Sequence, residues 1–357
     1  MKIRSMLWGL LAAGATASPA LAQTPYYEGK TITVLVAQAA GGGTDLFMRA
    51  MAPFMRKYIP GSPNIIVQNL SGGGTVRAMN MLAEGTKADG LTVAYGPWEP
   101  ISQALKMPEF RADYTKFGVF GAISDQRISV IRSDVPPGIK VPEDLGKVTE
   151  PFVQAGSTPT GLITLLGSMS LDLLEVPHKV VTGYKGGGDT YGALLQNQAQ
   201  FNTISYSTLV TRYRDFTDTG IGIAAYAYCY KDENGKFARF DNAPNIPCLS
   251  EVYQKIHGKE PSGTLWELLN WFLDLNGRVT FVGLTPAGVP QEALDALAAG
   301  FDGASKDPEL QELFLKQTGE PTRYVSIDQA KRTVQLLSDI PPDYIALLKK
   351  YVEAGQQ

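Results

Sequence analysis

The stretch TITVLVAQAAGGGTD, residues 31–45, joins a β-branched run to a glycine-rich turn. The run Thr31–Val36 is typical of a buried strand, and residues 45–58 continue with apolar side chains at helical spacing. The same order follows again, with a strand at 64–69, a glycine loop at 70–75 and a helix at 76–84. This repeated alternation predicts an α/β fold built on parallel strands.

Two further loops of this kind lie in the middle of the chain. Residues 155–161 and 183–189 each follow a predicted strand and precede a predicted helix. Parallel sheets bind ligands beyond the carboxyl ends of their strands, so the four loops indicate one shared site. We therefore predict two α/β lobes with a ligand cleft between them. The first lobe is discontinuous, 26–124 and 226–350, and the second is 125–225. The hinge is expected near 124–127 and 223–226, where strand 221–227 would return the chain to the first lobe.

The glycine loops predict anion binding. A glycine-rich turn before a helix exposes backbone N–H groups at the positive end of the helix dipole. Hydroxyl donors stand beside those amides at Thr44, Thr75, Ser157, Thr158 and Thr160. Asp45 is acidic, so we expect it to cap its own helix instead of touching the anion.

Composition excludes several classes of function. The 357 residues are 44% hydrophobic and 19% charged with a net charge of −3, which suits a globular chain but not a nucleic-acid binder. Two Cys and two His argue against a metal centre, and we expect no metal and no cofactor. The loops miss the dinucleotide pattern GxGxxG because Leu46 and Arg77 occupy the last glycine position, and no P-loop is present.

The first 22 residues are typical of a secretory signal peptide. Lys2 and Arg4 precede a short apolar run, and Ala20-Leu21-Ala22 offers a cleavage site. An uncleaved N-terminal anchor is the alternative. Removal of the signal would take the net charge from −3 to −5. Export also suits a disulfide between Cys229 and Cys248 around a turn-rich excursion; two free thiols are the alternative.

Several motifs carry a family resemblance. They are AQAAGGGTD at 37–45, NLSGGG at 69–74, ADGLT at 88–92, YKGG at 184–187, PNIPCLSE at 244–251 and TPAGVP at 285–290. In this order along the chain they resemble the Bug-type periplasmic solute receptors of the tripartite tricarboxylate transporter system. The resemblance implies a two-lobed type II periplasmic-binding-protein fold, a small organic carboxylate as ligand, membrane transporter subunits as partners, and a periplasmic location. It implies no enzymatic activity, and we expect a monomer.

The resemblance also implies a set of ligand-binding residues. In the first lobe these are Gly42, Gly43, Thr44, Gly73, Gly74 and Thr75, and in the second they are Ser157, Thr158, Thr160, Gly187, Gly188 and Asp189. Trp98 and Ser205, which follow predicted strands at the cleft, complete the candidates. The family often has an Asp in the strand after the YKGG helix, but residues 199–205 contain no carboxylate, which weakens the case for an acidic ligand contact.

Two other functions remain open at this point. An exported serine hydrolase would use Ser157 as its nucleophile, although Ser157 lies outside a GxSxG elbow. A sensor subunit would use the same binding fold to signal to a membrane kinase. The ligand is equally open among dicarboxylates, tricarboxylates and aromatic acids, with Trp98 slightly favouring an aromatic acid.

Overall fold

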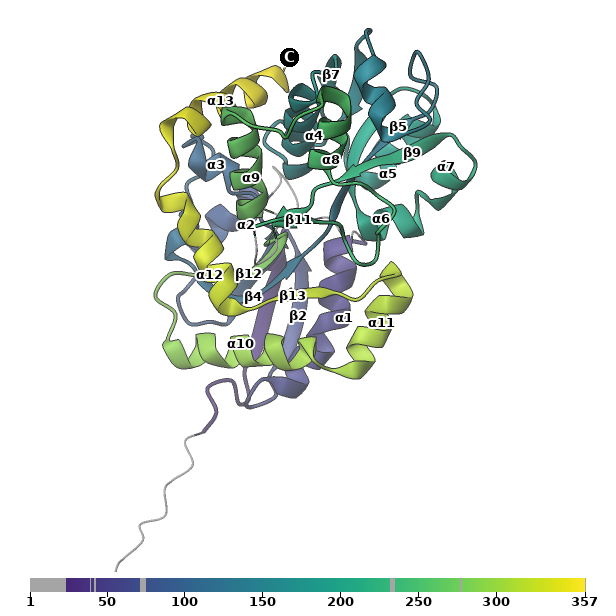
Figure 1. The fold of residues 1–357 in the computed structure, drawn as a ribbon. Coiled ribbons are helices and arrows are strands. Elements are labelled where there is room, and N and C mark those ends of the chain that lie inside the picture. The colour runs from purple at the N-terminus through teal and green to yellow at the C-terminus, as the bar shows by residue number, and fades with distance from the viewer. Residues whose placement is uncertain are drawn as a thin grey trace, which may run out of the picture.

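The structure, a computed structural model, describes residues 24–38, 40–41, 43–70, 75–231, 235–276 and 278–356. The proposed signal peptide 1–22 and the candidates Gly42, Gly73 and Gly74 lie outside these residues. Two sheets with helices on their faces form two lobes, one above the other in Figure 1. The predicted α/β class with two lobes is confirmed.

The first lobe contains a six-stranded sheet in the order β13-β4-β12-β3-β1-β2. Its strands are β1 (Thr31–Val36), β2 (Asn64–Asn69), β3 (Thr92–Pro97), β4 (Gly118–Ser124), β12 (Phe281–Thr285) and β13 (Arg323–Val325). Side chains alternate between the two faces, as the period of a strand requires. Val34 and Val36 pack under α1 (Gly43–Tyr58) and α10 (Gln291–Ser305), while Leu35 packs under α2 (Val76–Asn80) and α12 (Ile327–Gln335).

The second lobe contains a five-stranded sheet in the order β7-β6-β8-β5-β9. Its strands are β5 (Arg127–Arg132), β6 (Phe152–Ala155), β7 (His178–Val181), β8 (Phe201–Ser205) and β9 (Gly222–Ala227). One face is covered by α4 (Leu162–Leu173), α8 (Leu249–His257), α9 (Thr264–Asn276) and α13 (Pro342–Ala354). The other face is covered by α5 (Gly187–Leu195), α6 (Tyr206–Thr211) and α7 (Arg214–Asp218).

The first crossing between lobes lies where we predicted it, but the return does not. The chain leaves β4 at Ser124 and enters β5 at Arg127. Strand β9 then pairs with β5 in the second sheet, so the predicted return at 223–226 is wrong. The return follows α9, before β12, and a third crossing before α13 brings the C-terminus back to the second lobe. An apolar strand such as β9 fits either sheet, so its sequence could not choose between them.

The predicted lobe boundaries change accordingly. Residues 228–276 and 342–354, assigned by the sequence to the first lobe, bury Val252, Leu268 and Phe272 together with Leu348 in the core of the second. Parallel pairing holds for β1 with β2 and β3, and for β6 with β7 and β8. The strands that open each new lobe, β5 and β12, run antiparallel to their neighbours.

Short elements complete the chain. They are α3 (Ile101–Ala104), α11 (Pro308–Thr318), β10 (Tyr230–Lys231), β11 (Phe237–Ala238), a π-helical turn at Met81–Gly85 and 3₁₀ turns at Tyr114–Lys116, Pro142–Lys147 and Leu336–Ser338. The helix expected at 76–84 is thus α2 followed by a π turn. Among the described helices, none is long and apolar enough to cross a membrane.

The disulfide between Cys229 and Cys248 is present, as predicted. It closes the excursion that contains the antiparallel pair β10 and β11. Both cysteines are buried, and Glu251 accepts a hydrogen bond from the Cys248 N–H (2.7 Å) at the start of α8. The bond therefore ties the end of β9 to the first turn of α8.

Loss of this disulfide should destabilise the protein. Replacing both cysteines by serine (Cys229→Ser with Cys248→Ser) should lower the free energy of unfolding by about 3 kcal/mol, because the closed loop spans a sequence separation of 19. Urea unfolding of the double variant beside the oxidised wild type measures the difference. Equal midpoints would contradict this expectation, and reduced wild type serves as the control that keeps both sulfur atoms.

Candidate ligand cleft

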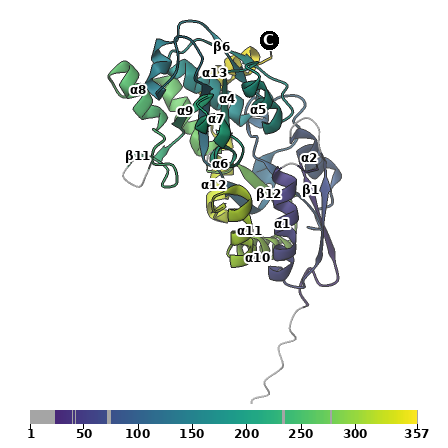
Figure 2. The same ribbon diagram turned by 90° about the vertical axis from the view of Figure 1, so that its right-hand side faces the viewer.

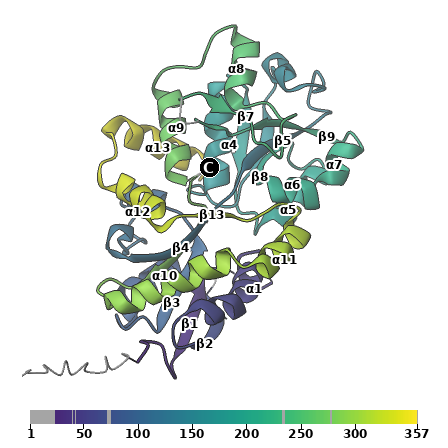
Figure 3. The ribbon, with the colours of Figure 1, turned by 60° about the horizontal axis from the view of Figure 1, so that its bottom comes forward.

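A cleft of about 570 Å³ lies between the two lobes. Figures 2 and 3 show the lobes from two further directions. The first lobe contributes Gln38, Gly43, Thr44, Leu46, Phe47, Tyr95, Ile123 and Phe281; the second contributes Gly187, Ser205, Ser207, Thr208, Thr211 and Arg212. The first crossing and the α11–β13 segment contribute Ser124, Asp125, Arg127, Phe314, Gln317, Thr318, Glu320, Pro321, Thr322 and Arg323.

Asp45 supports the first glycine loop, which is a different role from the cap of its own helix that the sequence predicted. Its carboxylate accepts hydrogen bonds from the Gly41 N–H (2.8 Å) and from Asn69 Nδ2 (2.9 Å), and it pairs with Arg49 (2.9 Å). Burial alone would raise the pKa of Asp45, but the bonds from Arg49, Gly41 and Asn69 outweigh it and lower that pKa. Gly41 has φ +77°, a conformation that favours glycine. Asp45 thus joins the ends of β1 and β2, and as an ionised acceptor it has no proton to donate to an anion.

Gly43 and Thr44 lie at the cleft, where the sequence placed them. No described residue lies within 4 Å of a Cβ atom added to Gly43, so the described structure leaves open space at the start of α1. Thr44 Oγ1 donates to Gln38 Oε1 (2.6 Å), which leaves the amide N–H groups of Gln38 for the cleft. Gln38 is a site residue that the glycine pattern did not indicate.

The second lobe repeats this arrangement with a different loop. Gly187 and Ser205 line the cleft, and a Cβ at Gly187 would also meet open space. Asp189 accepts a hydrogen bond from the Lys185 N–H (3.0 Å), as Asp45 does from Gly41. Asp189 therefore supports its own loop, and neither it nor Gly188 is among the residues that line the cleft.

Three other second-lobe candidates lie away from the cleft lining. Ser157, Thr158 and Thr160 belong to a turn whose Pro159 packs against Gly355 near the C-terminus. Among the described residues, neither histidine is hydrogen-bonded to Ser157; His178 Nδ1 lies 3.0 Å from the Val176 carbonyl oxygen. The geometry offers Ser157 no general base.

Trp98 and Thr75 are buried instead of facing a ligand. Trp98 is 1% exposed, its indole N–H donates to the Leu275 carbonyl (3.0 Å), and its ring lies 4.5 Å from that of Tyr114. Thr75 is 1% exposed. The expectation that Trp98 stacks on a ligand is therefore wrong, because its indole N–H is already bonded and its ring is buried against Tyr114 in the core.

The charged groups of the cleft were missed by the sequence analysis. Arg127 is 9% exposed, lies 3.7 Å from Asp125 and has no hydrogen-bond partner for its Nε among the described residues. Burial raises the pKa of Asp125 despite Arg127 beside it. The pKa of Glu320 is raised to about 7, mainly by burial and next by the charge of Asp125, although Arg323 opposes the shift. These charged residues come together from separate segments of the chain, and no sequence motif indicated them.

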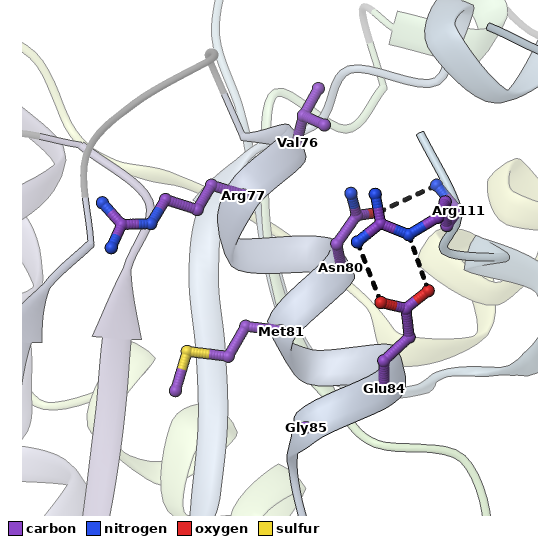
Figure 4. Close-up of a pocket in the computed structure, with 7 residues that line it drawn as sticks. All are labelled: Val76, Arg77, Asn80, Met81, Glu84, Gly85 and Arg111. Carbon is purple, nitrogen blue, oxygen red and sulfur yellow. Dashed lines mark hydrogen bonds and ion pairs between the residues drawn. The ribbon is translucent and has the colours of Figure 1, made fainter. Parts of the chain in front are cut away.

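A second hollow lies on the first lobe over α2 and the π turn, and Figure 4 shows its lining. Arg111 forms two hydrogen bonds to Glu84 (2.8 and 2.9 Å), and its N–H donates to Asn80 Oδ1 (2.9 Å). These hydrogen bonds connect the 108–113 segment to α2 and the π turn, so we interpret this hollow as a structural contact. All the residues that line it come from the first lobe.

Fold and site together define a class. Two α/β lobes joined by crossing segments, with a cleft lined by both, form the two-lobed fold of periplasmic binding proteins. The solved structure of the periplasmic binding protein BugD has a TM-score of 0.64 at 22% identity, covering 91% of this chain and 98% of that one. MatC from Rhodopseudomonas palustris with bound malate has a TM-score of 0.63 at 17% identity (90% and 99%). A second R. palustris protein, Rpa4515 with adipate, has 0.62 at 17% (92% and 97%).

The sequence comparisons are weaker. No family model matches the chain. A UPF0065 protein from Cupriavidus necator, encoded in the gbd 5′ region, is 26% identical over 195 residues, which is 52% of this chain. The chain spans about half the length of that relative, 56%. The resemblance to Bug-type receptors is thus confirmed for the fold, since identities this low establish architecture and no more.

Proposed function

We propose that this chain is an exported receptor that binds a small organic carboxylate between its lobes and delivers it to a tripartite tricarboxylate-type transporter in the membrane. The proposal depends on one observation, the burial of the Arg127 guanidinium at the cleft. A buried guanidinium needs partners, and its Nε has none among the described residues, so an anion in the cleft would supply one. Bound malate and adipate in structures of this fold are consistent with it.

Lobe closure follows from the placement of the donors. Arg127 and Ser205 are partners on neighbouring strands of the second lobe, while Gly43 and Gln38 belong to the first. A ligand that reaches both sets stabilises the closed state because only that state bonds it from both sides. The segments 124–127 and 278–281, together with the crossing before α13, would act as the hinge.

A thermal-shift screen with a library of carboxylates tests the proposal. A ligand at about 100 times its dissociation constant stabilises the native state by about 2.7 kcal/mol. We expect at least one carboxylate to raise the melting temperature, and isothermal titration should give one site per chain. No shift with any carboxylate would contradict the proposal. Hydrolysis of an ester lost on Ser157→Ala would favour the enzyme instead.

Binding should depend on pH through Glu320. Its side chain accepts from Asn242 Nδ2 (2.8 Å) and is faced by Asp125, Arg323 and Tyr206. With a pKa of about 7, Glu320 gains a proton as pH falls from 8 to 6, which removes a negative charge from the cleft. The affinity for a fully ionised carboxylate should therefore rise about five- to tenfold over that range.

Titration calorimetry at pH 6, 7 and 8 measures this change. Glu320→Gln is the matched control, because the amide keeps an acceptor for Asn242 but cannot ionise. It should bind equally well at all three values. An affinity of the wild type that is flat or rises with pH would rule out Glu320 as the responsible group.

A further inference from the structure

The interlobe cleft has one apolar side and one polar side. On the first lobe Leu46, Phe47, Ile123 and Phe281 line it, and Leu46 exposes 56% of its surface. On the second lobe hydroxyl groups line it: Ser205 Oγ lies 2.9 Å from Ser207 Oγ and 2.7 Å from Thr208 Oγ1. A ligand that fits both sides needs an apolar flank and a polar edge.

The apolar side is built on a stack of aromatic rings. Phe47 lies between Phe314 (4.7 Å between ring centroids, 9° between planes) and Tyr95 (5.4 Å, 12°), and Tyr95 continues to Phe281 (6.4 Å, 13°). Because two rings stack on Phe47, we expect its edge to be the part that faces the cleft. Ring edges carry partial positive charge, so they favour the negative face of another aromatic ring.

The charged groups limit the charge of the ligand. Three guanidinium groups (Arg127, Arg212 and Arg323) and two carboxyl groups (Asp125 and Glu320) are the charged side chains among the described residues of the lining. With both carboxyl groups ionised they leave one positive charge in excess, which one carboxylate neutralises. Further carboxylates on the ligand would face Asp125 and Glu320, and hydroxyl groups laid on the aromatic side would lose hydrogen bonds to water.

We infer that the ligand is a monocarboxylate with an aromatic ring, its carboxylate at Arg127 and Ser205 and its ring on the edges of Phe47 and Phe281. The inference rests on the proposed function and narrows it. It disfavours hydroxylated tricarboxylates, because Asp125 and Glu320 offset two of the three guanidinium charges of the described lining and leave too little positive charge for three carboxylates.

Titration calorimetry of the full-length mature protein with benzoate, cyclohexanecarboxylate and citrate tests the inference. Benzoate should bind at least about tenfold more tightly than citrate. Phe281→Leu keeps an apolar side chain but removes a ring, so it should weaken benzoate binding about three- to tenfold. It should change cyclohexanecarboxylate binding less than twofold, because that ligand has no π face.

Phe120→Leu is the matched control. Phe120 lies in β4, fully buried beside Phe301 (6.2 Å) and outside the cleft lining, so its loss should affect stability but not ligand preference. Two results would overturn the inference: an affinity for citrate equal to or higher than that for benzoate, or equal losses of affinity for benzoate and cyclohexanecarboxylate in Phe281→Leu. Neither result would contradict the proposal that the protein is a carboxylate receptor. Binding of no carboxylate in the wider library would overturn both.

Discussion

Arg127→Met should reduce carboxylate affinity at least about 100-fold while the folded state persists. The guanidinium is 9% exposed and its Nε lacks a partner among the described residues, so the ligand would complete its hydrogen bonds. Hydrogen bonds to charged groups contribute about 1.5–3 kcal/mol each, and two of them account for a loss of this size. Methionine keeps most of the apolar stem that packs in the second lobe.

Arg132→Met is the matched control for this prediction. Arg132 ends the same strand, but it is already bound to Asp134 (2.7 Å) and to the Leu194 carbonyl, away from the cleft. Titration calorimetry should show unchanged ligand affinity in Arg132→Met. Comparable affinity in Arg127→Met and wild type would remove Arg127 from the site and, with it, the main support for the proposed anion subsite.

Gly43→Val and Gly187→Val should each abolish detectable binding. No described residue lies within 4 Å of a Cβ atom added at either position, and neither glycine has a positive φ, so valine fits the backbone without strain. Its methyl groups would occupy the volume between the lobes, where the ligand must sit and across which the lobes close. We expect a loss of at least about 100-fold, with the melting temperature of the ligand-free protein within a few degrees of wild type.

Gly192→Val provides the comparison within α5. Gly192 also faces open space but is not part of the cleft lining, so its substitution should leave the affinity unchanged. Calorimetry and thermal melts on the three variants separate blocked binding from damage to the fold. Full binding by both cleft variants would show that the ligand lies elsewhere.

The first lobe shows which structural features can be predicted from the local sequence. Strands β1 and β2 have the bounds that their residue pattern predicted, because each strand buries side chains whose spacing can be recognised in the local sequence. The Cys229–Cys248 bond was also predictable, since both cysteines flank one turn-rich segment. The contact of Asp45 with Gly41 is local, but its contact with Asn69 depends on the pairing of β1 with β2.

The second lobe illustrates the limit. The sequence of a strand does not specify which other strand it pairs with. Whether β9 pairs with β4 or with β5 depends on which strand edge is free after folding. The prediction that Trp98 contacts the ligand was wrong for a related reason. A tryptophan after a strand suits both a cleft and a core, and only the approach of Leu275, 177 residues away in sequence, decided for the core.

The sequence by itself determined the alternation of strands and helices and the positions of the glycine loops between them. All of these arise from neighbours a few residues apart. Only the tertiary structure decided which loops share the cleft, that Arg127, Asp125 and Glu320 stand together in it, and that stacked rings form one side. The cleft residues come from segments far apart in the chain, since Asp125 and Arg127 belong to the first crossing and Glu320 to the α11–β13 segment. Their proximity is set by how the two sheets pack, which no local sequence pattern specifies.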